Sequence, residues 1–180
     1  MKKSQFAGLC MTGLLAGNEL GTLIGFHPAI RALPLRSQIE SERALTGRLG
    51  KIMPFYIVAS LAASGAAAAD RRGRPGFGPA MLSTGALAGM ALITVVAELP
   101  LNKRTVNYPS GGDEQGWSAI RRRWERFHQA RVALDIIAFG CLAAAALEEQ
   151  PEAALAGGVS DEYLLRRTEG MTRLPTSVRS

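Results

Sequence analysis

The sequence has 180 residues, of which 47% are hydrophobic and 20% are charged, and its formal net charge is +6. Its two cysteines, Cys10 and Cys141, exclude a disulfide framework and a zinc site built from paired cysteines. No glycine-rich phosphate-binding motif is present, which argues against bound nucleotide. The basic residues lie between long apolar runs, where they favour contact with anionic lipid, so we expect no nucleic-acid partner.

The hydrophobic residues are collected into four runs, each close to the about 20 mostly apolar residues that a helix needs to cross a bilayer. The runs are apolar all round, whereas a core helix of a soluble protein carries an apolar stripe. The sequence therefore predicts an all-α, four-helix transmembrane bundle, a multi-pass protein of the cell membrane whose first run is an uncleaved span. The runs cover residues 6–26, 52–69, 81–99 and 132–147.

The connections carry most of the charge. The first, 27–51, predicts a short amphipathic helix over 37–51 that lies on the membrane surface. The second, 70–79, is a tight loop. The third, 100–131, opens as a loop through 107–112 and becomes an interfacial helix from about Trp117 that runs into the fourth span. Residues 1–147 then form the membrane domain, and 148–180 form a mobile C-terminal tail.

Small residues predict close packing of the helices. Gly13, Gly17, Gly21 and Gly25 follow one another at four-residue intervals in the first span. Such spacing lets helices approach closely within a bilayer. The stripe serves either packing inside the bundle or self-association, so a homo-oligomer stays open.

Three ionisable residues lie inside the spans, where each costs at least about 2.5–3.5 kcal/mol at the bilayer centre. Glu19 is in the second half of the first span, Glu98 ends the third, and Asp135 is near the start of the fourth. In a bundle that alternates up and down, all three lie toward the side that bears the first and third connections. This asymmetry indicates a functional site at that end.

Helical spacing aligns further polar residues there. Steps of seven, four, three and four residues, at about 100° per residue, place five side chains on one stripe of the last helix. We expect this stripe to face Asn18, Glu19 and Thr22 of the first span and to close a polar pocket, near His27 and Asn102. The stripe consists of Trp117, Trp124, His128, Arg131 and Asp135. The ordinary alternatives are interfacial positions for the tryptophans and Glu98, and a helix-terminal role for His27.

The order of these motifs resembles the anthrone oxygenase-like family of small integral membrane proteins, over about residues 6–147. The resemblance rests on an acidic first span that ends in Gly25-Phe26-His27-Pro28 and a third span closed by Pro100-Leu101-Asn102. It also rests on Trp124-Glu125-Arg126-Phe127-His128-Gln129-Ala130-Arg131, which leads into the fourth span.

The resemblance implies that an anthrone-like aromatic polyketide is oxidised to a quinone with O2 as co-substrate, without a cofactor or metal. In that reaction His128 would act as general base, and Arg131 and Asn102 would stabilise the enolate oxygen. Trp124 and Trp117 would stack on the hydrophobic aromatic substrate. The remaining side chains would bind substrate or relay protons; they are Asn18, Glu19, His27, Glu98 and Asp135.

Two other functions remain open from the sequence. His27, His128 and one carboxylate could form the two-histidine, one-carboxylate site of a metal-dependent membrane oxidase. A membrane-embedded Glu19 is also compatible with a proton-coupled exporter of small molecules.

Overall fold

The computed structural model describes residues 2–148, and they are helical apart from short turns. Apart from Glu148, the predicted C-terminal tail lies outside the described residues. Two of the segments are short π-helical turns, named η1 and η2. In chain order the elements are α1 (Lys3–Gly21), η1 (Thr22–Phe26), α2 (His27–Arg31), α3 (Leu35–Ala69), α4 (Phe77–Ile93), η2 (Thr94–Glu98), α5 (Leu99–Val106) and α6 (Glu114–Leu147).

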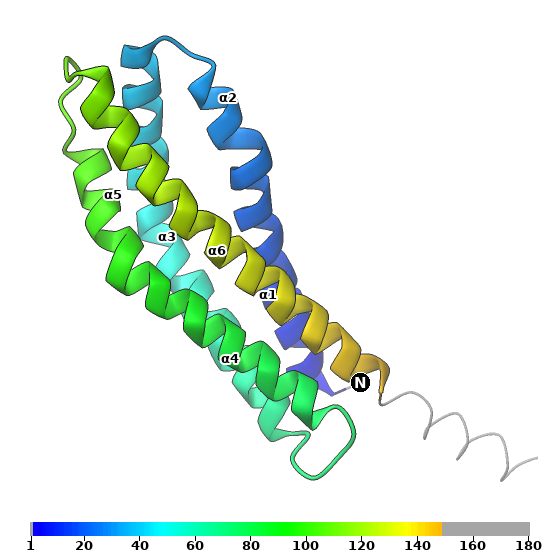
Figure 1. The fold of residues 1–180 in the computed structure, drawn as a ribbon. Coiled ribbons are helices and arrows are strands. Elements are labelled where there is room, and N and C mark those ends of the chain that lie inside the picture. Colours follow the sequence, from blue (N-terminus) through cyan, green and yellow to red (C-terminus); the bar gives the residue numbers. More distant parts are fainter. Residues whose placement is uncertain (1, 149–180) are drawn as a thin grey trace, which may run out of the picture.

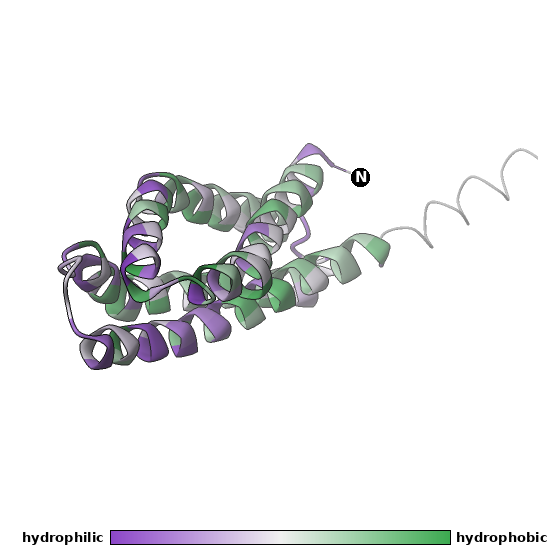
Figure 2. Ribbon diagram, turned by 90° about the horizontal axis from the view of Figure 1, so that it is seen from above, coloured by the Kyte–Doolittle hydropathy of each residue, from purple (hydrophilic) through white to green (hydrophobic). Residues whose placement is uncertain are grey.

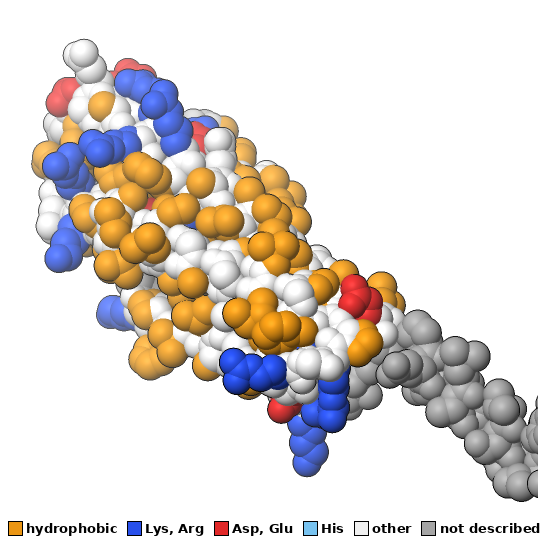
Figure 3. All heavy atoms as spheres, turned by 60° about the horizontal axis from the view of Figure 1, so that its bottom comes forward, with side chains coloured by type: hydrophobic (Ala, Val, Ile, Leu, Met, Phe, Trp, Pro, Cys, Tyr) orange, Lys and Arg blue, Asp and Glu red, His pale blue; other side chains and the backbone are white. Residues whose placement is uncertain are grey.

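These elements form four long helices, because α1, η1 and α2 are continuous, as are α4, η2 and α5. Each of the four is long and apolar enough to cross a membrane. They run alternately up and down, with the α2–α3 turn and the α5–α6 loop at one end and the α3–α4 turn at the other (Figure 1). Hydrophobic side chains form a broad band across the face in Figure 3, and Lys and Arg lie mostly toward its ends. The predicted all-α four-helix bundle is confirmed.

A helix covers 37–51 as predicted, but the prediction that it is a short separate helix is wrong. This stretch is the first half of α3, a continuous helix of 35 residues that contains Pro54 in its interior. The reason is that the stretch has a buried face of its own: Ile39 is 0% exposed and Glu42 is 2% exposed. Packing against the neighbouring helices therefore holds it in line with the bundle.

The third connection is also more helical than the sequence predicts at its start. Residues 100–106 belong to α5, where Leu101 and Thr105 are buried. The loop is confined to 107–113, and α6 then runs without interruption from Glu114 to Leu147, as predicted for the fourth span. Figure 2 shows that the N-terminal part of α6 is hydrophilic and its C-terminal part hydrophobic.

Only part of the glycine stripe makes close contacts. A Cβ built at Gly13 would lie 3.1 Å from the ring of Phe139, so the first and last helices do approach closely there. At Gly17, Gly21 and Gly25 an added Cβ would meet nothing within 4 Å among the described residues. Close packing inside the bundle is therefore confirmed at Gly13, whereas the other three glycines do not pack within the bundle and self-association stays a prediction there.

Each π-helical turn precedes a helix with proline in its first turn, Pro28 in α2 and Pro100 in α5. Proline has no N–H to continue the helical hydrogen bonds, and the wider π turn accommodates that loss. Thr22 begins η1 and Glu98 ends η2, and both side chains are buried. The two irregular turns therefore direct polar side chains into the bundle at the same end.

Candidate functional site

Arg131 joins three of the four long helices at the centre of the site. Its Nη2 donates to Oε1 of Glu19 on α1 at 2.6 Å, and its Nη1 donates to Oε2 of Glu98 on η2. Glu19, Glu98 and Arg131 are 3%, 1% and 5% exposed, so this pairing takes place out of water. Removing one partner from such a buried pair would leave an uncompensated charge in the bundle.

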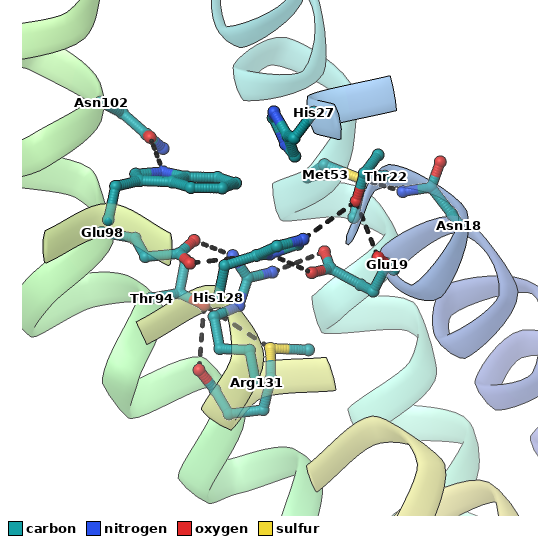
Figure 4. A network of polar contacts seen from close by, with 12 residues as sticks. Asn18, Glu19, Thr22, His27, Met53, Thr94, Glu98, Asn102, His128 and Arg131 are labelled. Atoms are coloured by element: carbon teal, nitrogen blue, oxygen red, sulfur yellow. Dashed lines mark hydrogen bonds and ion pairs between the residues drawn. The ribbon is translucent and has the colours of Figure 1, made fainter. Parts of the chain in front are cut away.

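His128 lies one turn before Arg131 and touches the same carboxylates. Its Nδ1 is 3.3 Å from Oε2 of Glu19 and 3.9 Å from Oε1 of Glu98, and its Nε2 is 3.1 Å from Oγ1 of Thr22 (Figure 4). The Thr22 hydroxyl donates its single hydrogen to the backbone carbonyl of Glu19 at 2.8 Å. Because that hydrogen is used, His128 Nε2 is the donor to Thr22, whereas Nδ1 lies near the two carboxylates without a hydrogen-bond partner among the described residues.

Trp124 and Asn102 lie beside His128 and are hydrogen-bonded to each other. The indole Nε1 donates to Oδ1 of Asn102 at 2.8 Å, which leaves both hydrogens of the Asn102 amide nitrogen without a partner among the described residues. The Trp124 ring stacks on His128 with centroids 4.5 Å apart, and it meets the edge of His27 at the same separation. The Arg121 guanidinium lies 4.4 Å from its centroid. Four protein groups thus hold the indole in place.

These side chains line one end of a cavity of about 250 Å³ between α1, α3, η2 and α6. Eight of the ten predicted site residues line it, which is what the facing polar stripes of the first and last helices predict. The eight are Asn18, Glu19, His27, Glu98, Asn102, Trp124, His128 and Arg131.

Trp117 and Asp135 do not line this cavity. Trp117 is buried against Tyr108, with ring centroids 5.3 Å apart, and near Arg121. Asp135 is 1% exposed, and neither of its carboxylate oxygens has a hydrogen-bond partner among the described residues. Both lie on the predicted stripe of α6, but at levels above and below the cavity.

One wall of the cavity is supplied by α3 and was not predicted from the sequence. Met53, Pro54, Ile57 and Val58 line the cavity, and they lie in an apolar stretch with no polar residue to mark it. Part of this wall reaches the outer surface of the bundle. Pro54 and Val58 from α3, with Val95 and Leu99 opposite, are exposed and form what we call the lip of the cavity.

Glu42 is a second buried residue near the site that was not predicted from the sequence. Its Oε1 lies 2.8 Å from Nδ1 of His27 and 2.9 Å from Nη2 of Arg121. The sequence predicted only a short amphipathic helix over 37–51 and singled out none of its charged residues. The available signal was the position of Glu42 three residues after Ile39, on the apolar face of the same helix.

His27 and His128 lie close together, with ring centroids 5.5 Å apart. Within residues 2–148, however, no group of three or more His, Cys, Asp or Glu side chains is arranged to hold a metal ion. The three-ligand site considered from the sequence is not formed by this geometry.

A comparison with protein families gives a match over most of α3 and the helices that follow. The family model described as anthrone oxygenase matches residues 44–141. This range includes the α3 wall, η2 and most of α6, and it leaves out the first helix with Glu19 and His27. No curated protein and no solved structure matches the chain.

Proposed function

The chain belongs to the anthrone oxygenase family, and from this premise we propose that it oxidises an anthrone-like aromatic polyketide to the quinone with O2, in the cell membrane and without a cofactor. Membership in this family indicates a general oxygenase-like role. The observation that supports the specific reaction is the cavity itself, which is apolar along α3 and polar at the end formed by Asn102, His128 and the Arg131 pairs.

The size and lining of the cavity suit a compact, flat ligand. About 250 Å³ lies just below the about 300–1,000 Å³ typical of small-molecule pockets. An anthrone is an apolar ring system with one ketone oxygen and one acidic methylene. Its rings match the apolar wall of α3, and its polar atoms match the opposite end.

Asn102 is the best donor for the ketone oxygen. The Trp124 indole fixes the orientation of the amide because N–H can donate only to Oδ1, at 2.8 Å. The amide nitrogen is then free to donate to a ligand, and it would stabilise the negative charge that develops on the oxygen when the methylene loses a proton. Arg131, which the resemblance also implied for this role, has both terminal nitrogens on carboxylates and instead holds the helices together.

The lip of the cavity supports a substrate that arrives from the bilayer. Val58 is 67% exposed and Val95 is 61% exposed, yet both line the cavity. They lie in helices long and apolar enough to cross a membrane. A poorly soluble polyketide dissolved in the hydrocarbon layer would therefore reach the cavity between α3 and η2 without crossing water.

The test is O2 uptake and quinone absorbance with the full chain in detergent and a simple anthrone. The reference is the spontaneous oxidation rate in the same detergent without protein. Oxidation above that rate that survives a metal chelator supports the proposal. Loss of activity with the chelator would overturn cofactor independence, and no uptake above the spontaneous rate would overturn the reaction.

The matched variant is Asn102→Asp, which keeps an oxygen acceptor for the Trp124 indole but loses the amide donor. We expect kcat/KM to fall by about 100-fold, the usual cost of losing one oxyanion donor. The melting temperature should stay close to that of the unmodified chain. An active Asn102→Asp variant would remove Asn102 from the mechanism.

A further inference from the structure

His27 differs from His128 in the groups that hold it. Glu42 Oε1, which is buried on α3, accepts from His27 Nδ1 at 2.8 Å and from Arg121 Nη2 at 2.9 Å. Nη2 also lies 3.2 Å from Nδ1. A guanidinium only donates and an ionised carboxylate only accepts, so both N–H groups point to the Glu42 oxygen. The proton of neutral His27 is thereby placed on Nδ1.

In the neutral ring the lone pair then lies on the other nitrogen, Nε2. Nε2 has no hydrogen-bond partner among the described residues, and it is not among the fully buried unpaired atoms. His27 lines the cavity. Its unprotonated nitrogen is therefore available to a ligand.

No comparable lone pair is offered by the Arg131 cluster. His128 Nε2 donates to Thr22, and His128 Nδ1 is fully buried. Oε2 of Glu19 and Oε1 of Glu98 are also fully buried, and the remaining oxygen of each carboxylate accepts from Arg131. His128 Nδ1 and these two oxygens have no hydrogen-bond partner among the described residues, but because they are fully buried a substrate in the cavity would not reach them without a rearrangement of the bundle.

We infer that His27, oriented by Glu42, is the general base that removes the proton from the acidic carbon of the substrate; this inference rests on the proposed function. The C–H bond breaks, its electron pair passes into the enolate, and the proton moves to His27 Nε2. The carbanion then adds to O2, and the peroxide takes the proton back. Loss of water from the hydroperoxide leaves the carbonyl, so one O2 is consumed and one H2O is released for each quinone.

Glu42 acts as a positioning residue in this step. It does not line the cavity, but its carboxylate fixes the tautomer of His27 and stabilises the imidazolium that forms, as the buried carboxylate does for the histidine of a catalytic triad. The ionisable groups that face His27 are Glu42 from α3, Arg121 and His128 from α6, and Arg31 from its own helix.

The first test compares variants in the anthrone assay with the full chain. We expect His27→Ala to lower kcat by about 100-fold or more, the usual contribution of a general base, with KM little changed. Added imidazole should restore the rate in His27→Ala and fail to do so in His128→Ala. Rescue of His128→Ala alone, or a kcat of His27→Ala within about threefold of the unmodified chain, would overturn the inference.

Glu42→Gln tests the positioning role even if His27→Ala fails to fold. We expect kcat to fall by about tenfold with KM unchanged, and Glu42→Asp to recover part of the loss. The control is Glu40→Gln, which changes an exposed carboxylate of the same helix that pairs with Arg36. Equal kcat values for Glu42→Gln and Glu40→Gln would overturn the role of Glu42.

A second test does not depend on activity. The chain has two histidines, and diethyl pyrocarbonate acylates unprotonated, accessible imidazole nitrogens. Peptide mass spectrometry should find His27 modified first and His128 resistant, with His27 protected when anthrone is bound. A chain that shows this pattern but no oxidation would contradict the proposed function alone. Modification of His128 before His27 would overturn the inference whatever the activity.

Discussion

Glu19 on the first helix accepts a hydrogen bond of 2.6 Å from Arg131 on the last, between side chains that are 3% and 5% exposed. Because Glu98 accepts from the same guanidinium, replacement of Arg131 leaves two buried carboxylates without their cation. We expect Arg131→Met to lower the free energy of unfolding by about 3–5 kcal/mol. Thermal unfolding in detergent measures this loss.

The control for Arg131→Met is the same change in a Glu19→Gln, Glu98→Gln background. When both carboxylates are replaced by neutral amides, loss of the guanidinium should lower the free energy of unfolding by much less. The difference between the two backgrounds is the coupling energy between Arg131 and the carboxylates. Equal losses in the two backgrounds would show that packing around Arg131, rather than charge, stabilises the bundle.

The turn between α3 and α4 contains two glycines with positive φ, and only one of them is packed so closely that a side chain would not fit. Gly76 has φ +79°, and an added Cβ would lie 2.7 Å from the backbone oxygen of Ala145 on α6. Gly73 has φ +72° with nothing within 4 Å. We expect Gly73→Ala to lower the free energy of unfolding by about 1–2 kcal/mol, because alanine disfavours this backbone conformation. Gly76→Ala should lower it by about 1–3 kcal/mol more, because its Cβ would also collide with Ala145. Melting curves of the two variants make the comparison, and equal losses would contradict it.

The sequence predicts at which end of the bundle the site lies, but it does not predict all the residues that line the cavity. Helical spacing is local, so the stripe with His128 and Arg131 and the facing pair of Glu19 and Thr22 can be derived from residue numbers, and the contacts between them confirm the prediction. Trp117, on the same stripe, packs instead on Tyr108 of the loop. Nothing in the spacing along one helix predicts that contact.

Contacts that depend on how the helices are rotated against one another could not be predicted. The π turns at 22–26 and 94–98 change the rotation of the short helices that follow, so the sequence placed His27 and Asn102 near the pocket without giving their contacts. The proline that follows each turn was visible, but it does not reveal how far the next side chains rotate. Glu42 was missed because its partners, His27 and Arg121, come from two other helices.

The loop before α6 gives a pH-dependent prediction. The backbone N–H of Gly116 donates to Oδ1 of Asp113 at 2.7 Å, and this hydrogen bond lowers the pKa of the Asp113 carboxyl below its usual 3.8. A lowered pKa in the folded chain means that the stabilisation is present above the unfolded pKa and is lost as pH falls through the folded one. The difference in melting temperature between the unmodified chain and Asp113→Ala should therefore be present at neutral pH and disappear in acid.

Asp113→Asn is the control for that measurement, because an amide oxygen can cap the helix without titrating. Its melting temperature relative to Asp113→Ala should not vary with pH through the carboxyl titration. A pH-independent difference between the unmodified chain and Asp113→Ala would show that the carboxylate does not stabilise the start of α6.

Two adjacent valines on η2 test whether the substrate enters through the lip of the cavity. Val95 and Val96 are 61% and 67% exposed, but only Val95 lines the cavity. We expect Val95→Trp to obstruct the entrance and lower kcat/KM by about tenfold or more, mainly through KM, as a misfitting group does in a pocket. Val96→Trp adds the same bulk to the outer surface and should leave kcat/KM unchanged. Steady-state oxidation of anthrone in liposomes measures both, and equal kinetics for the two variants would place the entrance elsewhere.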